Sequence, residues 1–403
     1  MGQLTHTTGF RSALAALVLT LTLTACASGE AATPESASPS PRAPTTAPTA
    51  SSVPTVTPTA TSPGADATMP ETLFSIDCDD LIDSAQLADL FAEPVEPSTV
   101  VGSQVSTSRG PLSFATRSVG GVACEWNNGE VAIQTDEGFG SYSENPDYAG
   151  LRFEALPGAG EDWAYYTDIY PNQDPLACGI APGGGDAAGF CMSDSLVDDV
   201  WIHGVITGVS SDATTAEALQ VQLKPVFDEM SAALTASRTA EGPVGAVPTD
   251  IVLDGTCEQF MPGEAIQGLF GTAAATVWVR PHGGWSFEAS TSSAVGAVPC
   301  LMGAATADIG VGHVTWLPGG AWAAELWEPA GESIEVAGLT SDDSAHLACK
   351  AQASCELELV IGGNWIRVET YSDDAAGDEY VPTVDLQTAT TAVAEQIVVN
   401  LRS

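Results

Sequence analysis

Nine cysteines constrain this chain more than any other feature, because eight of them form two matching sets of four. The same short sequences recur around them: Leu-Ala precedes the third cysteine of each set, and Trp-Ile follows the fourth cysteine at the same distance. Four cysteines that match in order and in neighbours indicate a tandem duplication of one module. The first set is Cys78, Cys124, Cys178 and Cys191, and the second set is Cys257, Cys300, Cys349 and Cys355.

The ninth cysteine, Cys26, closes an N-terminal segment that is typical of a secretory signal. Arg11 precedes an apolar run over residues 13–23, which is shorter than the about 20 residues of a membrane-spanning helix. Residues 23–26, Leu-Thr-Ala-Cys, resemble the lipobox of bacterial lipoproteins, and this resemblance implies cleavage before Cys26 and a lipid on its thiol. An ordinary signal peptide with an unmodified cysteine is the alternative. We expect a mature chain that is anchored by lipid to the extracytoplasmic face of the cell membrane.

An even number of cysteines outside the cytoplasm favours disulfide bonds. Four cysteines allow three pairings, and in each module we expect the first to pair with the second and the third with the fourth. The third and fourth cysteines of each set are close in sequence and lie in strand-like segments, and a hairpin can hold two such segments side by side. A structural zinc site is the alternative use of four cysteines, but the C-x2-C spacing that is typical of such sites is absent.

Composition divides the chain into five segments. Residues 1–25 are the expected signal peptide, and 26–72 are the lipidated cysteine followed by a stalk of Ala, Pro, Ser and Thr. The stalk has too few large apolar side chains to offset the entropy of ordering, so we expect it to be disordered. The remainder is long enough for two domains, which we place at 73–236 and 250–403 with a linker at 237–249.

Each module is expected to be an α+β domain, in which an antiparallel sheet follows one helix and precedes another. The helix signals are an Asp-Ser cap, a Pro-Gly start and two long amphipathic patterns, which together predict helices at 85–91, 215–234, 264–270 and 386–401. Alternating patterns predict strands at 130–135 and 276–279, and a hairpin of 355–361 with 365–371 across Gly362 and Gly363.

One stretch carries a family resemblance. The run Cys-Asp-Asp-Leu-Ile-Asp-Ser at 78–84, with Cys-Glu-Trp at 124–126, resembles a domain of secreted actinobacterial lipoproteins, most of which have no known function. The excess of Arg over Lys is typical of the same bacteria. The resemblance covers the first half of each module and implies no catalytic residues. The second module departs from it, with Met302 in the place of the tryptophan, so whether both modules bind the same target stays open.

Charge excludes two classes of partner. The chain carries a formal net charge of −41 at pH 7. Nucleic acid and anionic lipid headgroups are recognised by clustered Lys and Arg, so neither is an expected partner. A surface of this charge favours cationic peptides, metal ions or simple solubility.

No catalytic motif is found. The chain lacks the Gly-x-Ser-x-Gly elbow, the His-Glu-x-x-His zinc motif and a phosphate-binding glycine loop, and we expect no cofactor. His203 alternates with Trp201 and Val205 along a predicted strand, so we expect a packed histidine rather than a catalytic one. The other histidines after Cys26 are His282, His313 and His346.

Two sets of residues are candidates for ligand contact. The carboxylates of Asp373, Asp374, Asp378 and Glu379 supply oxygen ligands for a calcium ion, although their spacing does not match a known calcium loop and a solvated acidic surface is the alternative. Tryptophan is abundant in the second module, and exposed indoles stack on sugars or peptides, so the second set is Trp316, Trp322 and Trp327. Packing in the core is the alternative for these tryptophans.

These patterns together predict a non-enzymatic binding or sensing module at the cell surface. Its expected partners are the membrane, through the lipid on Cys26, and a cell-wall glycan, a peptide or another surface protein. A wall-associated hydrolase or transferase and a cation-binding accessory protein are the alternatives.

Overall fold

A computed structural model describes residues 69–98, 110–130, 132–135, 142–145, 147–180, 189–240, 244, 247–253, 255–261, 264–265, 268, 275–279, 286–304, 309–327, 329, 331–350, 354–371 and 385–403. All of them belong to one compact unit, Thr61–Ser403. The expected signal peptide, Cys26 and nearly all of the stalk lie outside the described residues.

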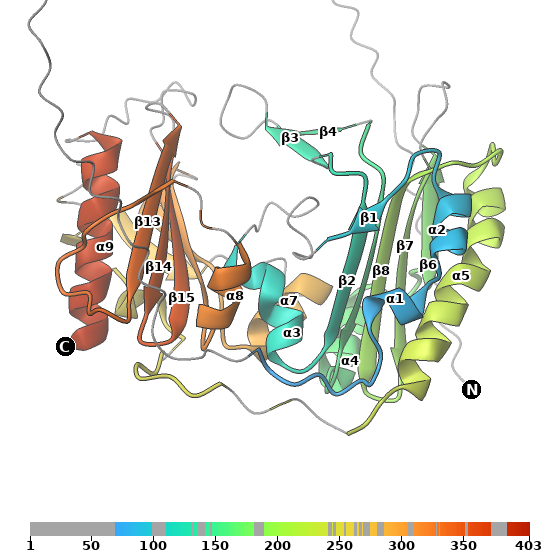
Figure 1. The fold of residues 1–403 in the computed structure, drawn as a ribbon, viewed down its shortest axis with the longest axis horizontal. Coiled ribbons are helices and arrows are strands. Elements are labelled where there is room, and N and C mark those ends of the chain that lie inside the picture. The colour runs from blue at the N-terminus through green and yellow to red at the C-terminus, as the bar shows by residue number, and fades with distance from the viewer. Residues whose placement is uncertain are drawn as a thin grey trace, which may run out of the picture. The chain divides into compact units, whose positions relative to one another are not determined.

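A six-stranded antiparallel sheet forms the first module, in the order β1-β2-β5-β8-β7-β6. Its strands are β1 (Glu96–Pro97), β2 (Val122–Asn127), β5 (Gly150–Leu156), β6 (Leu176–Ile180), β7 (Gly189–Val197) and β8 (Val200–Val209). Three helices, α1 (Cys78–Leu81), α2 (Ser84–Leu90) and α5 (Ala216–Ala236), cover one face of this sheet and close its core (Figure 1). A small pair, β3 (Ile133–Thr135) and β4 (Tyr142–Glu144), forms a separate ribbon.

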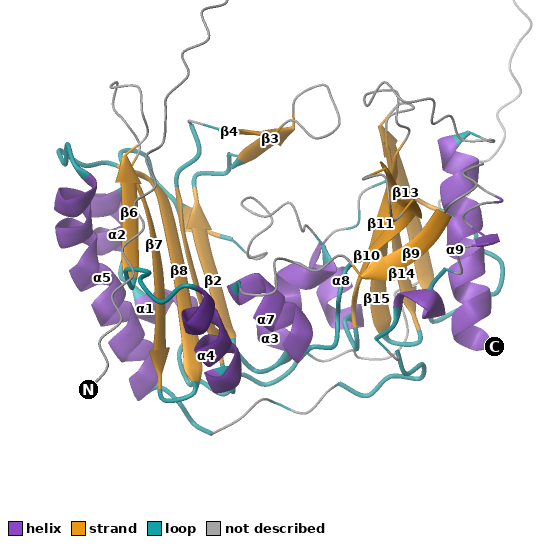
Figure 2. Ribbon diagram, turned by 180° about the vertical axis from the view of Figure 1, so that it is seen from behind, coloured by secondary structure: helices purple, strands orange, loops and turns teal. Residues whose placement is uncertain are grey.

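A seven-stranded antiparallel sheet forms the second module, in the order β12-β13-β14-β15-β11-β10-β9. Its strands are β9 (Ala275–Val279), β10 (Cys300–Ala304), β11 (Ile309–Leu317), β12 (Glu332–Ser333), β13 (Ser344–Lys350), β14 (Ser354–Ile361) and β15 (Asn364–Tyr371). Helix α9 (Leu386–Arg402) packs on β14 and β15 (Figure 2), and the 3-10 turn η2 (Cys257–Gln259) lies against α9.

The two sheets share one topology. Five strands of the first, β2-β5-β8-β7-β6, have the same order along the chain and in the sheet as β10-β11-β15-β14-β13 of the second. Each sheet packs on a long C-terminal helix and has its own core of buried apolar side chains. The predicted α+β class with two antiparallel modules is therefore confirmed.

The disulfide bonds follow the predicted pairing within each module. The bonds are Cys78–Cys124, Cys178–Cys191, Cys257–Cys300 and Cys349–Cys355. In the second and fourth bonds the two cysteines lie directly opposite each other on adjacent antiparallel strands, β6 with β7 and β13 with β14. No bond joins the modules.

Local signals explain where the predicted helices begin. The Asp83 carboxylate accepts hydrogen bonds from two backbone amides of α2. The Asp83 amide in turn donates to the side-chain oxygen of Gln86, which completes a capping box. Thr215 caps α5 and Asp385 caps α9 in the same way, through their side-chain oxygens. Most of the helix predicted at 264–270 lies outside the described residues.

Two short segments each place a phenylalanine against the module to which the segment does not belong in sequence. The first is the 3-10 turn η1 (Pro111–Phe114), which contacts β11 and β15, and the second is helix α7 (Phe287–Ala294). Helix α3 (Ala115–Ser118), which follows η1, packs on β2 and β5 of its own module and contacts α7. Phe114 packs with Trp322 and Trp365 of the second module, and Phe287 packs with Trp201 and other residues of the first. The modules therefore exchange equivalent segments reciprocally.

The remaining helices border these contacts: α4 (Gly160–Ile169) carries Trp163 and Tyr166 beside Trp201, and α8 (Ala321–Trp327) carries Trp322 beside Phe114. Within the described residues, no helix is both long enough and apolar enough to cross a membrane.

Candidate functional site

Buried charged side chains gather on the face of each sheet that lies away from its long helix. Along β5, Leu151 and Phe153 enter the core beneath α5, so the alternate residues Arg152 and Glu154 point to the other face. Asp194 on β7 and His203 on β8 lie directly opposite each other on that same face. We call these four residues, with Glu288 of α7, the His203 cluster.

Asp194 is the centre of the His203 cluster. Its Oδ1 atom accepts a hydrogen bond from Trp201 Nε1 at 2.9 Å and lies 2.9 Å from His203 Nδ1. Arg152 makes two ion pairs, one with Glu154 at 3.4 Å and one with Glu288 at 3.1 Å. The cluster is therefore a continuous chain of polar contacts that runs from β7 across β8 and β5 to the exchanged helix α7.

The second module repeats this arrangement around Arg367, which we call the Arg367 cluster. Its guanidinium meets three carboxylates: Glu356 at 2.5 Å, Glu369 at 3.0 Å and Glu358 at 3.6 Å. Trp365 Nε1 donates to Glu358 Oε2 at 2.6 Å, as Trp201 donates to Asp194 in the first module. Burial raises the pKa of Glu358 to about 8, although the Arg367 charge opposes this shift, so one of the three carboxylates keeps its proton at neutral pH.

The two clusters match at three positions, an acid, a base and a tryptophan. Asp194 and Glu358 each lie three residues after the fourth cysteine of their set, and each faces a base two residues after the matching tryptophan. The base is His203 in one module and Arg367 in the other. This pairing was not predicted from the sequence, although an acid at the same distance from a matched cysteine in both modules was a detectable signal.

Burial limits what these clusters can do chemically. Asp194 is 5% exposed, His203 4%, Glu358 4% and Arg367 2%. A substrate has almost no surface to meet on these groups, and each already has a polar partner within the protein. These buried pairs are suited to a structural role: they hold adjacent strands in register and hold the exchanged segments in place.

The second module also holds a less buried group at the other end of β15. Tyr371 Oη lies 2.5 Å from His313 Nδ1, and Glu369 Oε2 lies 3.5 Å from His313 Nε2. Burial raises the pKa of Glu369, but the charges of His313 and Arg367 outweigh it, so the pKa lies below its ordinary value. Two metal-ligating side chains do not make a metal site, and the described part of the chain holds no group of three or more His, Cys, Asp or Glu side chains placed to bind a metal ion.

A groove of about 840 Å³ lies between α5 and the end of β7. It exists because the edge strand β6 begins at Leu176, opposite Ser193, while β7 continues to Val197. After Ser193, β7 has no described neighbouring strand on its β6 side, so its side chains that face α5 have no strand residues beside them there. The groove, which we call the α5 groove, is lined by Asp174, Pro175, Leu176, Ser193, Ser195, Val197, Gln220, Lys224, Phe227, Asp228, Ser231, Ala232, Thr235 and Ala236.

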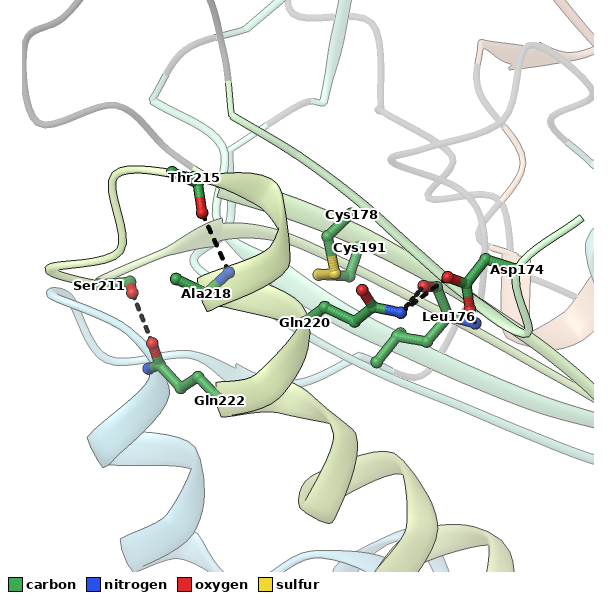
Figure 3. The surroundings of a disulfide bond; sticks show 9 residues. All are labelled: Asp174, Leu176, Cys178, Cys191, Ser211, Thr215, Ala218, Gln220 and Gln222. Atoms are coloured by element: carbon green, nitrogen blue, oxygen red, sulfur yellow. Dashed lines mark hydrogen bonds between the residues drawn. A yellow bond between two sulfur atoms is a disulfide. The ribbon is translucent and has the colours of Figure 1, made fainter.

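Hydrogen bonds fix one wall of the α5 groove. Gln220 Nε2 donates to Asp174 Oδ2 at 3.0 Å and to the Leu176 carbonyl at 2.8 Å, close to the Cys178–Cys191 bond (Figure 3). One turn further along α5, Lys224 pairs with Asp228 at 2.7 Å on the exposed side. The α5 helix is therefore held at a fixed place beside the edge strand, and the groove is part of the fold.

The tryptophans that were predicted to contact a ligand lie inside the second module. Trp316 is 0% and Trp322 is 3% exposed, so the prediction of ligand contact is wrong for both. The reason is that both indoles fill the space between the sheet and its covering segments: Trp316 packs on Phe260, and Trp322 packs on the exchanged Phe114. Trp327 is half-buried, and the Arg367 guanidinium lies 5.5 Å from its ring.

The other predicted positions have mixed outcomes. His203 is packed, as expected. His346 is half-buried on β13, and burial lowers its pKa. Asp373, Asp374, Asp378 and Glu379 lie outside the described residues, as do His282 and the lipidation site Cys26.

Comparisons with known proteins give little guidance. No family profile and no curated sequence matches this chain. Among solved structures, the chain is similar to the di-domain ARO/CYC StfQ from the steffimycin biosynthetic pathway, with 8% identity, a TM-score of 0.18 and coverage of 77% of this chain and 98% of that one. It is also similar to the di-domain ARO/CYC BexL from the BE-7585A biosynthetic pathway, with 10% identity, a TM-score of 0.16 and coverage of 79% and 88%. These scores are too low to argue for a shared fold or activity.

Proposed function

We propose that this protein is a non-catalytic binding protein, held by a lipid on Cys26 at the extracytoplasmic face of the membrane, and that the α5 groove is its ligand site. The groove is the observation on which the proposal rests. Its volume of about 840 Å³ is within the range of about 300–1,000 Å³ that is usual for small-molecule sites.

The lining of the groove supports a small amphipathic ligand. Leu176, Val197 and Phe227 offer apolar contact, while Ser195 and Thr235 offer hydroxyl groups. The charged side chains Asp174, Lys224 and Asp228 already have partners within the protein. A ligand with an apolar body and a few polar groups meets this surface better than a strongly charged one.

The buried clusters support binding over catalysis. Acid–base catalysis needs a titrating group within hydrogen-bond reach of a substrate. His203 and Asp194 are covered by Phe287 and by the strands around them, and neither lines the groove.

The four disulfide bonds support an address outside the cytoplasm, where such bonds persist. Mass spectrometry of the membrane-bound protein tests the address directly. We expect a mature N-terminus at Cys26 that carries a lipid. A chain that is cleaved elsewhere or bears an unmodified Cys26 contradicts this part of the proposal.

Binding of a neutral fluorescent probe, N-phenyl-1-naphthylamine, tests the groove. Ala232→Trp places an indole in the groove, and we expect it to weaken probe binding about tenfold or more, the equivalent of about 1.4 kcal/mol. Val221→Trp, on a highly exposed position of the same helix, is the control and should bind as the native chain does. Equal binding by native chain and Ala232→Trp would show that the groove is not the site.

A further inference from the structure

The exchanged helix α7 covers the one buried histidine of the first module. The Phe287 ring stacks on the His203 imidazole, with centroids 4.9 Å apart and planes 15° apart. The same ring meets Trp201 edge-on at 5.6 Å, and Phe287 is 2% exposed. The next residue, Glu288, pairs with Arg152. Two consecutive residues of the second module are thus held by His203 and its neighbours.

Five titratable groups among the described residues lie around His203. Asp194 of β7 contacts its Nδ1 atom, and Arg152 of β5 lies 3.4 Å from its Nε2 atom. Glu154, also on β5, pairs with Arg152, while Glu288 reaches in from α7. The fifth group is Tyr166 of α4, whose hydroxyl donates to Asp194 Oδ2 at 3.4 Å.

Protonation of His203 changes the partners of Arg152. A neutral imidazole with its proton on Nδ1 accepts a hydrogen bond from Arg152 at Nε2. A protonated imidazole cannot accept there and repels the guanidinium, which leaves Arg152 to Glu154 and Glu288. The protonated ring is also a cation against the face of Phe287, an attractive arrangement. Both effects hold α7 more firmly.

We propose that His203 is a pH-responsive latch between the two modules: the protonated imidazole holds α7 on the first sheet, and its deprotonation at higher pH loosens α7. The inference does not depend on the α5 groove, because none of the residues that line the groove belongs to the His203 cluster.

Thermodynamic linkage gives the sign of the effect. Burial lowers the pKa of His203, but the hydrogen bond and charge of Asp194, together with the charge of Glu288, outweigh burial and raise the pKa above its ordinary value. Because docked Glu288 favours the protonated ring, protonation must favour docked Glu288 by the same factor. This contribution is complete while His203 is protonated whether or not α7 is docked, and it is lost as pH rises through the raised pKa of the docked state.

Hydrogen–deuterium exchange of the full mature chain tests the latch. Amide exchange in α7, corrected for the intrinsic pH dependence, is followed from about pH 5 to about pH 9, the range in which histidine titrates. We expect the opening constant of α7 to rise with pH, by about tenfold for each unit by which docking raises the His203 pKa. His203→Gln should abolish this pH response. A native α7 whose protection is independent of pH, or an equal response in His203→Gln, overturns the proposal.

Two further variants keep the test decisive. Glu358→Gln removes the other buried group that titrates in this range, in the second module, and should leave the α7 response intact. Glu288→Gln changes a half-exposed side chain and should lower the His203 pKa, which is read from its imidazole NMR shifts. If the His203 pKa is the same in Glu288→Gln as in the native chain, docking and protonation are not coupled and the latch does not exist.

Discussion

At the scale of single residues, an indole N–H that meets a buried carboxyl group is the feature common to both modules. Trp365 donates to Glu358, and with its high pKa this carboxyl keeps its proton at neutral pH. The partners lie on adjacent strands, β15 and β14, so the bond also fixes their register. Loss of the donor leaves a buried oxygen with fewer hydrogen bonds, which costs about 1–3 kcal/mol.

Trp365→Phe isolates this contribution. We expect it to lower the free energy of unfolding by about 1–3 kcal/mol more than Trp316→Phe does, measured by urea denaturation at neutral pH. Trp316 is a matched control because it is equally buried and packs on one phenylalanine, but its indole nitrogen has no hydrogen-bond partner among the described residues. Equal losses in the two variants would show that the bond to Glu358 contributes nothing beyond packing.

Sequence reasoning at this scale succeeded where the pattern was local. The strand alternation that placed His203 beside Trp201 predicted a packed histidine, and it is packed. The same reasoning failed for Trp316 and Trp322, because an isolated sequence does not reveal which segment covers a strand face. Trp322 is covered by Phe114, which lies more than half the folded chain away in sequence and belongs to the other module.

At the scale of elements, the disulfide bonds differ in the length of chain that they close. The Cys78–Cys124 bond spans 46 residues and ties α1 to β2, whereas Cys349–Cys355 spans 6 residues within one hairpin. In the chain-entropy description, a longer closed loop removes more freedom from the unfolded state. The two bonds should therefore contribute unequally to stability, although both are structural.

Removal of each bond by a pair of Cys→Ala substitutions tests this difference. We expect a loss of about 4 kcal/mol for Cys78 with Cys124 and of about 2 kcal/mol for Cys349 with Cys355, from urea unfolding of the oxidised proteins. Reduced native protein, which has lost every bond, sets the upper limit of the effect. A larger loss at the short hairpin than at the long loop would contradict the entropic account.

Most elements could be predicted because their signals are local. The Asp83 cap, the Thr215 cap and the Gly-Gly turn at 362–363 each determine a boundary within a few residues, and the structure has those boundaries. The α5 groove could not be predicted, because it depends on where one edge strand begins relative to its neighbour. That register is set by the Cys178–Cys191 pair and by Pro175, which has no N–H to continue the ladder.

At the scale of the whole folded unit, duplication predicted two similar modules but not their exchange of segments. A short apolar segment buries its phenylalanine equally well on its own sheet or on the sheet of an identical neighbour, so the sequence pattern is the same in both cases. Ser-Phe occurs in both exchanged segments, with Phe114 as the last residue of η1 and Phe287 as the first residue of α7. The contacts of these two phenylalanines, together with the Arg152–Glu288 ion pair, distinguish the two arrangements.

Cleavage of the linker tests the exchange. With a protease site inserted between Ala240 and Val247, each fragment keeps its whole sheet and both of its disulfide bonds. We expect the cleaved protein to remain one particle with the mass of both fragments, measured by light scattering after size-exclusion chromatography. Phe114→Ala with Phe287→Ala should separate the fragments, because each buried ring contributes about 3–5 kcal/mol to their association.

Phe260→Ala is the control for this experiment. Phe260 is as deeply buried as the exchanged residues, but it packs on Trp316 inside the second module. Its loss should lower the stability of that fragment by a similar amount and leave the two fragments associated. If the cleaved native protein separates at once, or if the double variant stays associated while Phe260→Ala separates, the exchanged phenylalanines do not hold the modules together.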